Sequence, residues 1–280
     1  MGLPILVTGG TGTLGRRVVP LLRDAGCEVR VMSRHSHDEL SNAGRAPLRQ
    51  ATRGDGVRYV TGDLSTGEGV DAAVAQAGAG TIVHLAGTQK GDGDKARHLV
   101  RAASRAGAEH LVYISVVGAE RVPVVSAVDR AMFGYFASKR EAEEVVEGSG
   151  LPWTTLRAAQ FHSLVYLVVR QATKLPIIPV PAGMRFQPVD EGDVAARLVE
   201  LALGKPAGLV PDMAGPRVYG MDELIRSYLA ATHRRRLLLR VPLGGRAYRA
   251  YRAGANLAPD GTLGTRTWEE YLAARLREER

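Results

Sequence analysis

The feature that most constrains this chain is an apolar run that breaks into glycines at three-residue spacing and then into a helical pattern. The run covers Ile5–Thr8, the glycines are Gly9, Gly12 and Gly15, and helically spaced apolar residues follow over Leu14–Leu22. Glycine has no Cβ, so backbone amides in such a turn can approach an anion closely, and the N-terminus of the next helix favours negative charge. The pattern predicts a strand, a pyrophosphate-binding turn and a helix. The alternative is a glycine-rich turn without a ligand.

Length and cysteine content narrow the class of protein. At 280 residues the chain is long enough for one large α/β domain, with or without a small appendage. No segment approaches the roughly 18 uninterrupted apolar residues of a membrane span, and Met1–Val7 has no cationic region before an apolar core. We therefore expect a cytoplasmic protein. Cys27 is the single cysteine, which excludes an intrachain disulfide and a metal site built from paired thiolates, so we expect no metal.

The positive charge raises the question of nucleic acid. The formal net charge is +8, and the excess is mostly arginine spread along the chain, with a dense run at His233–Arg236. Only 5% of the residues are aromatic, so few side chains could stack on bases. A basic run is more often a solvated helix end or a site for anionic ligands. We expect a small-molecule substrate as partner, and neither nucleic acid nor a membrane.

Short β-branched runs alternate with longer helical stretches through the first part of the chain. This alternation predicts an α/β fold with a doubly wound parallel sheet and helices on both faces. The expected strands are Pro4–Thr8, Glu28–Ser33, Val57–Thr61, Thr81–Leu85, His110–Ser115 and Trp153–Arg157. The expected helices are Leu14–Ala25, Val70–Ala77, Asp94–Ala106, Ala131–Ser149 and Gly192–Leu203.

The regular alternation stops after about Arg157. We assign residues 1–157 to a nucleotide-binding core, and residues 158–280 to the completion of that core plus a small substrate-covering region, all in one compact unit. Arg234–Leu263 holds few periodic apolar positions and is expected to be irregular or mobile. Thr267–Glu279 predicts a closing amphipathic helix. Its apolar face holds Trp268, Tyr271, Leu272 and Leu276.

Six motifs occur in an order that resembles the short-chain dehydrogenase/reductase superfamily. They are Thr8–Gly15, Gly62–Leu64, His84–Gly87, Tyr113–Ser115, Tyr135–Lys139 and Val189–Ala195. More narrowly, the chain resembles the atypical branch of NmrA-like, NAD(P)H-binding proteins, over about residues 3–203. The resemblance implies a Rossmann-type fold for residues 1–157 and a bound nicotinamide dinucleotide.

The resemblance also implies which residues hold that cofactor. Those of the pyrophosphate turn are Gly9, Thr11, Gly12, Thr13, Leu14 and Gly15. Those expected near the adenine ring and along the ribose are Asp63, Leu64, Ala86 and Gly87. An alternative role for Asp63 is that of a helix N-cap or a turn residue after a strand.

The end of the second expected strand predicts which dinucleotide is favoured. A carboxylate there hydrogen-bonds the ribose hydroxyls of NAD, whereas an arginine pairs with the 2′-phosphate of NADP. This chain has Ser33 and Arg34 there, and no acid before Asp38. We therefore expect NADP(H) rather than NAD(H), with Arg16 as a second candidate cation. The alternative is that these arginines are ordinary surface cations.

Tyr135 and Lys139 form the candidate catalytic pair. Residues four apart on a helix share one face, and an ammonium lowers the pKa of a neighbouring phenol. By the resemblance, Lys139 also hydrogen-bonds the ribose, while the tyrosine exchanges a proton with a carbonyl oxygen as hydride moves. The alternative is an aromatic residue at a helix start followed by a surface lysine.

A third catalytic position lies just past the fifth expected strand. In the resembled enzymes a Ser or Thr there polarises the substrate carbonyl. Depending on the alignment, Ser115 or Val116 takes this position in the chain. If it is Val116, one hydrogen-bond donor to the developing oxyanion is missing, a loss of roughly 3 kcal/mol by analogy with other oxyanion sites.

The residues after the sixth expected strand are candidates for the substrate pocket. By the resemblance, Gln160, Phe161 and His162 border it. A lone histidine beside apolar residues is more often structural than a general acid. Asp190 and Asp193 are expected to cap the start of a helix rather than to catalyse.

The functional hypothesis is an NADPH-dependent oxidoreductase that transfers a hydride to a small carbonyl, enone or quinone. The competing hypothesis is a non-enzymatic NmrA-like sensor that binds the dinucleotide and signals its redox state, although such sensors commonly lack the tyrosine and lysine. A third is an epimerase or dehydratase of nucleotide sugars, but the region after Arg157 has no obvious second diphosphate clamp. Relatives often pair through the helices expected at Asp94–Ala106 and Ala131–Ser149, so a homodimer is an open alternative.

Overall fold

The computed structural model describes residues 3–34 and 57–279, and these divide into two compact units. The first takes its described residues from Met1–Ile114, Ser138–Leu156 and Ala195–Val210. The second comprises Ser115–Ala137, Arg157–Val194 and Pro211–Arg280. The chain crosses between them five times. Four crossings lie within β5 (His110–Val116), α5 (Ala127–Glu147), β6 (Trp153–Ala158) and α7 (Glu191–Leu203), and the fifth lies between Val210 and Pro211.

The first unit is built on a parallel sheet. Its other strands are β1 (Ile5–Thr8), β2 (Val29–Ser33), β3 (Val57–Thr61), β4 (Thr81–His84) and the short β9 (Gly208–Leu209). The strand order is β3-β2-β1-β4-β5-β6, with β9 paired to β6. The order reverses between β1 and β4, which is where ligands bind in doubly wound sheets. The α/β fold with a doubly wound parallel sheet, predicted from the alternation, is confirmed.

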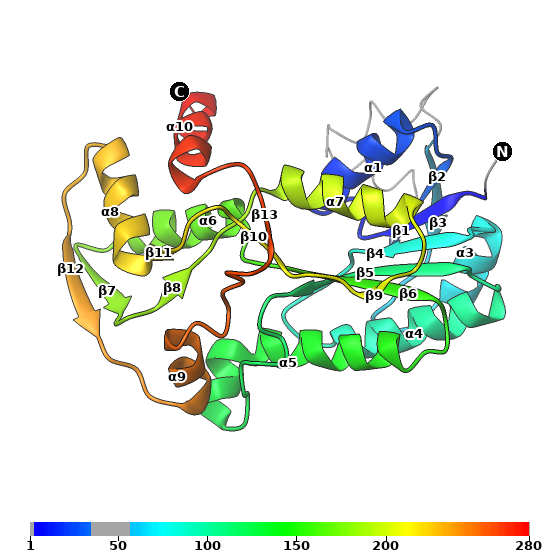
Figure 1. Ribbon diagram of the computed structural model, residues 1–280, viewed down its shortest axis with the longest axis horizontal. Helices are drawn as coiled ribbons and strands as arrows, with labels where there is room; N and C mark the ends of the chain where they lie inside the picture. Colours follow the sequence, from blue (N-terminus) through cyan, green and yellow to red (C-terminus); the bar gives the residue numbers. More distant parts are fainter. Residues whose placement is uncertain (1–2, 35–56, 280) are drawn as a thin grey trace. The chain divides into compact units, whose positions relative to one another are not determined.

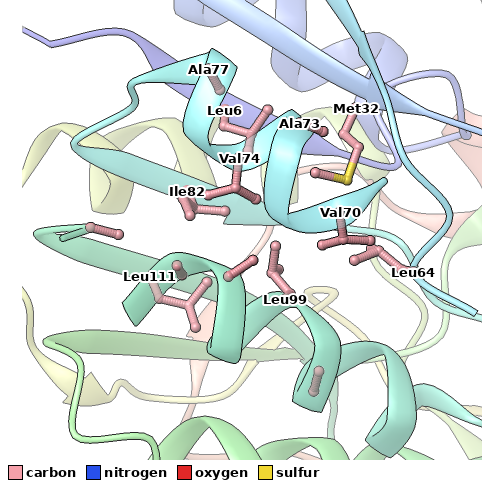
Figure 2. Close-up of a cluster of buried hydrophobic side chains, with 14 of the residues drawn as sticks. Leu6, Met32, Leu64, Val70, Ala73, Val74, Ala77, Ile82, Leu99 and Leu111 are labelled. Carbon is pink, nitrogen blue, oxygen red and sulfur yellow. The ribbon is translucent and has the colours of Figure 1, made fainter. Parts of the chain in front are cut away.

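Helices cover both faces of this sheet (Figure 1). Helix α1 (Gly15–Asp24) lies on one face, and α3 (Val70–Ala77) and α4 (Asp92–Arg105) lie on the other. Figure 2 shows the core beneath α3 and α4, where Leu6 and Ile82 of the sheet meet Val74 and Leu99 of the helices. Because helices cover both faces, β1 and β5 are buried along their whole length rather than at alternate residues.

The second unit has two cores of its own. Its further elements are α6 (His162–Ala172), β7 (Ile177–Pro181), β8 (Arg185–Phe186), β10 (Met213–Ala214), β11 (Tyr219–Gly220), α8 (Met221–Ala231), β12 (Leu237–Val241), α9 (Arg246–Arg252), β13 (Thr262–Leu263) and α10 (Trp268–Glu278). β7 pairs with β12 in parallel and β8 pairs with β11 in antiparallel fashion. One core joins α6, α8 and α10, and the other joins α9 to the first turns of α5.

The structure corrects one expectation for this unit. Arg234–Leu263 was expected to be irregular, but it contains β12, α9 and β13. The sequence of β12 shows no clear periodicity because the strand is only partly buried on one face. In α9, arginines stand between the buried Ala247, Tyr248 and Tyr251 and interrupt the apolar pattern. The predicted closing helix at Thr267–Glu279 is confirmed as α10, whose first turn Thr267 and Glu270 cap reciprocally.

Helix α5 begins one turn earlier than expected. Its start was placed at Ala131, and the structure has it at Ala127. Ser126 accepts a hydrogen bond from the Asp129 amide at 3.0 Å, and the Asp129 carboxylate accepts one from the Ser126 amide at 3.1 Å. This reciprocal cap satisfies two amides that the helix leaves open and fixes the start. No helix in the described part of the chain has both the length and the apolar character to cross a membrane.

Candidate functional site

The glycine turn after β1 lies against the end of β4. A Cβ on Gly9, whose φ is +70°, would lie 2.7 Å from the backbone nitrogen of Ala86. A Cβ on Gly15 would lie 2.3 Å from the carbonyl oxygen of Gly9. Gly12 is exposed, and its nearest such contact is Gly9 O at 3.2 Å. Two glycines therefore let the turn close on itself and on β4, and the third leaves its outer side open.

The N-terminus of α1 has no cap of its own. Leu14 precedes the helix without a side-chain hydrogen bond to it, and the first turn contains no acidic residue. The Arg16 guanidinium donates to the carbonyl oxygen of Thr11 at 2.9 Å and so braces the loop. An uncapped helix start behind an open glycine turn is what a bound diphosphate requires. The buried Leu14 anchors this turn, and Thr13 beside it is exposed.

The residues predicted to select the cofactor lie at the neighbouring strand. β2 pairs with β1, with Met32 opposite Thr8, so Ser33, the last residue of β2, and Arg34 come next to the glycine turn. Ser33 is half-buried and Arg34 is exposed. Asp38 lies outside the described residues.

Asp63 and Leu64 follow β3, the next strand along the sheet. One Asp63 carboxylate oxygen accepts a hydrogen bond from the Ser65 amide at 2.7 Å, which is the turn-capping geometry of the alternative role. The Leu64 side chain is buried in the core beneath α3, and its carbonyl oxygen lies 2.8 Å from Nδ1 of His98. An adenine-binding role for either residue stays a prediction.

Lys139 is held in a buried ion pair inside the first unit. Its Nζ lies 3.2 Å from the carboxylate of Asp92, and it donates to the hydroxyl of Tyr113 at 3.4 Å and to the carbonyl of Ile114 at 3.3 Å. Burial alone would lower the pKa of Lys139, but Tyr113 and the Asp92 carboxylate outweigh it and raise that pKa above its usual value. A Cβ on Gly87 would lie 2.7 Å from the ammonium, so only glycine fits there without moving the lysine.

Two lysines share the single carboxylate of Asp92. Lys95 lies 3.1 Å from it, and all three charged side chains are buried. Thr88 donates its amide to the same carboxylate at 2.8 Å, and the Asp92 amide donates to Ser138 at 3.1 Å. This group carries one more positive than negative charge, which suits a site for an electron-rich ligand atom. Asp92 and Lys95 are not among the residues predicted from the sequence, where their only signal is the pair of acids that opens α4.

A histidine and a tyrosine extend this buried group toward β1. The ring of His84 stacks on that of Tyr113 with centroids 5.4 Å apart, and its Nδ1 lies 2.7 Å from the hydroxyl of Thr8. Burial, together with the nearby Lys139 ammonium, lowers the pKa of His84 to about 3. The ring is therefore neutral at physiological pH, and the excess positive charge belongs to the lysines.

The other candidate catalytic residues belong to the second unit. Val116 points into the core beside α9, so its neighbour Ser115 faces the opposite side of the strand. Ser115 is buried, and its hydroxyl has no hydrogen-bond partner among the described residues. Tyr135 is 39% exposed and lies one turn before Lys139 on the continuous helix α5. These roles stay predictions.

The three candidate pocket residues follow β6. Gln160 and Phe161 are half-buried, and the backbone of Gln160 pairs with Val189. His162 is wholly buried, its ring stacks on Tyr271 with centroids 5.1 Å apart, and neither ring nitrogen has a partner in the described chain. Burial lowers the pKa of His162 to about 4. A neutral, packed ring indicates a structural role, and its place at a pocket stays a prediction.

Asp190 and Asp193 lie at the start of α7. Asp190 accepts from the amide of Gly192 at 2.7 Å and pairs with Arg266 at 2.9 Å. Asp193 accepts from the amide of Thr265 at 2.7 Å. Asp190 caps the start of α7, whereas Asp193 was expected to cap it and instead binds Thr265. Both carboxylates tie α7 to the segment before α10.

Comparison with known proteins agrees with this architecture. The profile of a family described as NAD(P)H-binding matches residues 9–203. A Streptomyces griseus protein named (4-alkanoyl-5-oxo-2,5-dihydrofuran-3-yl)methyl phosphate reductase is 33% identical over 57% of this chain and 48% of its own. A Caulobacter vibrioides protein named ceramide reductase is 29% identical over 74% of this chain and 63% of its own. The NADPH-dependent quinone oxidoreductase QOR2 of Escherichia coli, solved with NADPH, superposes with a TM-score of 0.77 over 97% of this chain and 99% of its own, at 17% identity.

The chain spans less than two thirds of the length of the two curated relatives. The likeness to the solved structure concerns the fold, because the identity is low. The family profile, by contrast, covers most of the chain, including the glycine turn, Asp92 and Lys139. On that match, and in agreement with the predicted NmrA-like resemblance, the chain belongs to the NAD(P)H-binding family.

Proposed function

We propose that this protein is an NADPH-dependent oxidoreductase that reduces a small carbonyl, enone or quinone. The observation that carries the proposal is the buried Lys139, fixed by Asp92 beside Gly87 at the carboxyl end of β4 and four residues after Tyr135 on α5. A buried ammonium that a carboxylate fixes near the carboxyl end of a strand in the nucleotide-binding sheet is typical of a reaction site. A lysine with only a surface role would be exposed.

The residues present fit the dinucleotide. The open turn at Gly12 and the uncapped start of α1 would hold the pyrophosphate. Arg34, exposed after β2, would pair with the 2′-phosphate that distinguishes NADPH from NADH. Ala86 and Gly87 follow β4, which is next to β1, and Asp63 and Leu64 follow β3, two strands away on the other side. These four residues would border the adenosine.

The chemistry divides between the cofactor and the chain. When bound, NADPH would supply the hydride for the substrate carbon and would leave as NADP⁺. As the carbon–oxygen double bond is reduced, Tyr135 donates its phenolic proton to the oxygen, and the Lys139 ammonium stabilises the phenolate that remains. Ser115 would donate a hydrogen bond to the same oxygen. Solvent then returns a proton to the tyrosine, so one hydride and one proton are consumed in each turnover.

The names of the relatives support reduction as the reaction type. Both curated relatives reported above are named as reductases, and the solved structure is described as a quinone oxidoreductase. The substrates in those names differ widely, so the shared fold alone does not specify the substrate of this chain. A cytoplasmic location and a homodimer belong to the same proposal.

The test follows NADPH absorbance with a panel of quinones, enones and aldehydes. We expect Tyr135→Phe to lower kcat by about 100-fold or more while the Kd for NADPH is unchanged, because a general acid contributes that much. Tyr228→Phe, which removes a hydroxyl from a core ring on α8, is the matched control and should keep full activity. Tight NADPH binding without turnover on the panel would instead favour the sensor hypothesis. Failure to bind either dinucleotide would exclude both functions.

A second titration tests cofactor choice. Losing a charge-assisted hydrogen bond costs about 1.5–3 kcal/mol, so we expect Arg34→Gln to weaken NADPH binding by about 10- to 150-fold and to leave NADH binding unchanged. Arg101→Gln on α4 is the control for a lost surface charge. Equal losses for both dinucleotides would contradict the assignment of Arg34.

A further inference from the structure

The outer face of the β7–β12 sheet is apolar and exposed. In β7 alternate residues pack into the second unit's core, and those between them face outward. The parallel register sets Leu237 beside Ile177 and Leu239 beside Pro179. Leu237 and Leu239 are 64% and 55% exposed. The four outward side chains form one surface, here named the β7–β12 patch, which consists of Ile177, Pro179, Leu237 and Leu239.

Cations border the patch at the end where both strands begin. Because the strands are parallel, the residues before β7 and the residues before β12 come to the same end. A pocket of about 660 Å³ there is lined by Lys174, Pro176, Arg235, Arg236 and Leu237. A second pocket, of about 510 Å³, continues along Arg234 to Arg226 of α8. The patch therefore has a cationic rim with room for small anionic groups.

Acidic residues are missing from the segments that build this surface. The sequence has none between Glu147 and Asp190, and none between Glu223 and Asp260. The two acids of α8 are already paired, Asp222 with Arg226 at 3.1 Å and Arg240 at 3.0 Å, and Glu223 with Arg217. The segments that contain β7 and β12 therefore offer no carboxylate to the cations ahead of β12.

We propose that the β7–β12 patch docks this protein on an anionic lipid bilayer. The leucines enter the boundary between headgroups and acyl chains, and the arginines and Lys174 pair with lipid phosphates. The sequence predicts no membrane partner because it has no spanning segment, but a protein that binds at the bilayer surface needs no such segment. The inference is independent of the proposed reaction.

Other occupants fit the same surface less well. A second copy related by a two-fold axis would bring one arginine run against the other. Single-stranded RNA would need aromatic side chains to stack on, and the outward residues of the patch include none. Pro179 and Pro181 remove amide donors from β7, which disfavours the addition of a partner's strand at its edge.

Vesicle flotation with the full chain tests the proposal. We expect binding to phosphatidylcholine vesicles that contain about 30% phosphatidylglycerol, and none to pure phosphatidylcholine, at near-physiological salt. Leu237→Gln/Leu239→Gln should weaken partitioning about tenfold or more. Arg234→Gln/Arg235→Gln should weaken it about 30-fold, at about a kcal/mol for each cation. Arg236 is kept in this variant, because it donates to the carbonyl of Thr173 at 3.3 Å and holds the chain ahead of β12.

Matched variants guard against a nonspecific loss. The control for the leucine variant is Leu164→Gln/Leu167→Gln, which changes two leucines of α6 that are 50% and 61% exposed. The control for the arginine variant is Arg101→Gln/Arg277→Gln, which removes two positive charges from exposed positions on α4 and α10. Both controls should bind as the wild type does. Equal losses in controls and patch variants would overturn the proposal, as would failure of the wild type to float. A dimer in sedimentation that the Leu237→Gln/Leu239→Gln variant abolishes, without vesicle binding, would assign the surface to a second copy instead.

Discussion

Replacing His162 by phenylalanine should remove a defined part of the acid sensitivity of this protein. The ring is wholly buried, has no hydrogen-bond partner among the described residues, and has a pKa lowered to about 4. In the unfolded chain a histidine has a pKa of about 6.5. Between these two values the unfolded chain binds a proton that the folded chain does not, so stability falls as the pH falls from about 6.5 to about 4.

The size of the effect follows from the two pKa values. At about pH 4.5, protonation of this histidine stabilises the unfolded state relative to the folded state by RT ln[(1 + 10²)/(1 + 10⁻⁰·⁵)], or about 2.5 kcal/mol. At about pH 7.5 this stabilisation is close to zero. The wild type should therefore lose about 2.5 kcal/mol more than the His162→Phe variant between these pH values. Any overpacking by the larger ring acts equally at both pH values and cancels in the difference.

Urea denaturation followed by circular dichroism measures this difference. Fluorescence is unsuitable, because Trp268 lies 6.2 Å from the His162 ring and would report the substitution itself. His84, whose pKa is lowered to about 3, remains in both proteins and contributes equally to both. The reasoning is refuted if the two proteins lose the same stability on acidification, or if the variant loses more.

Three further predictions rest on other contacts. Gly15→Ala should lower the free energy of unfolding by about 1–3 kcal/mol, because the new Cβ would lie 2.3 Å from the backbone oxygen of Gly9. In Gly12→Ala the new Cβ would lie 3.2 Å from the same oxygen, so this variant should keep its stability and lose dinucleotide affinity in calorimetry. Asp92→Asn should cost about 3–5 kcal/mol in urea denaturation, because it leaves two buried ammonium groups without their carboxylate, and an unchanged urea midpoint would argue against the ion pairs. His233→Gly should raise stability by about 1 kcal/mol, because this residue has a φ of 53° at the end of α8; a decrease would contradict the strain.

The nucleotide-binding part of the fold was predictable from local pattern. β1 to β6 match the expected strands to within one residue at either end. A strand that is buried on both faces has a largely apolar sequence bounded by turn residues, so its ends can be predicted. The glycine spacing likewise predicted the turn at the switch point between β1 and β4, since only glycine lets Gly9 approach Ala86 so closely.

The second unit was harder to predict because its strands are short and bury one face. Leu237–Leu239 is an unbroken apolar run, yet its first and last residues are exposed, so neither strand nor helix periodicity marks it. The start of α5 is a different case. The capping signal of Ser126 and Asp129 was present in the sequence, and the apolar pattern alone placed the helix one turn too late.

The strands, the turn and the candidate residues of the dinucleotide site were predictable from local sequence, because they depend on neighbours a few positions apart. Which charges meet depends on how the chain folds. The spacing of Tyr135 and Lys139 marked the lysine, but Asp92, forty-seven positions before it, supplies the carboxylate that holds it, and Lys95 adds the second charge. Tertiary structure also decided that His162 is buried without a hydrogen bond while Leu237 faces outward. Burial and ion pairing depend on segments that meet only when the chain folds, and no local periodicity encodes them.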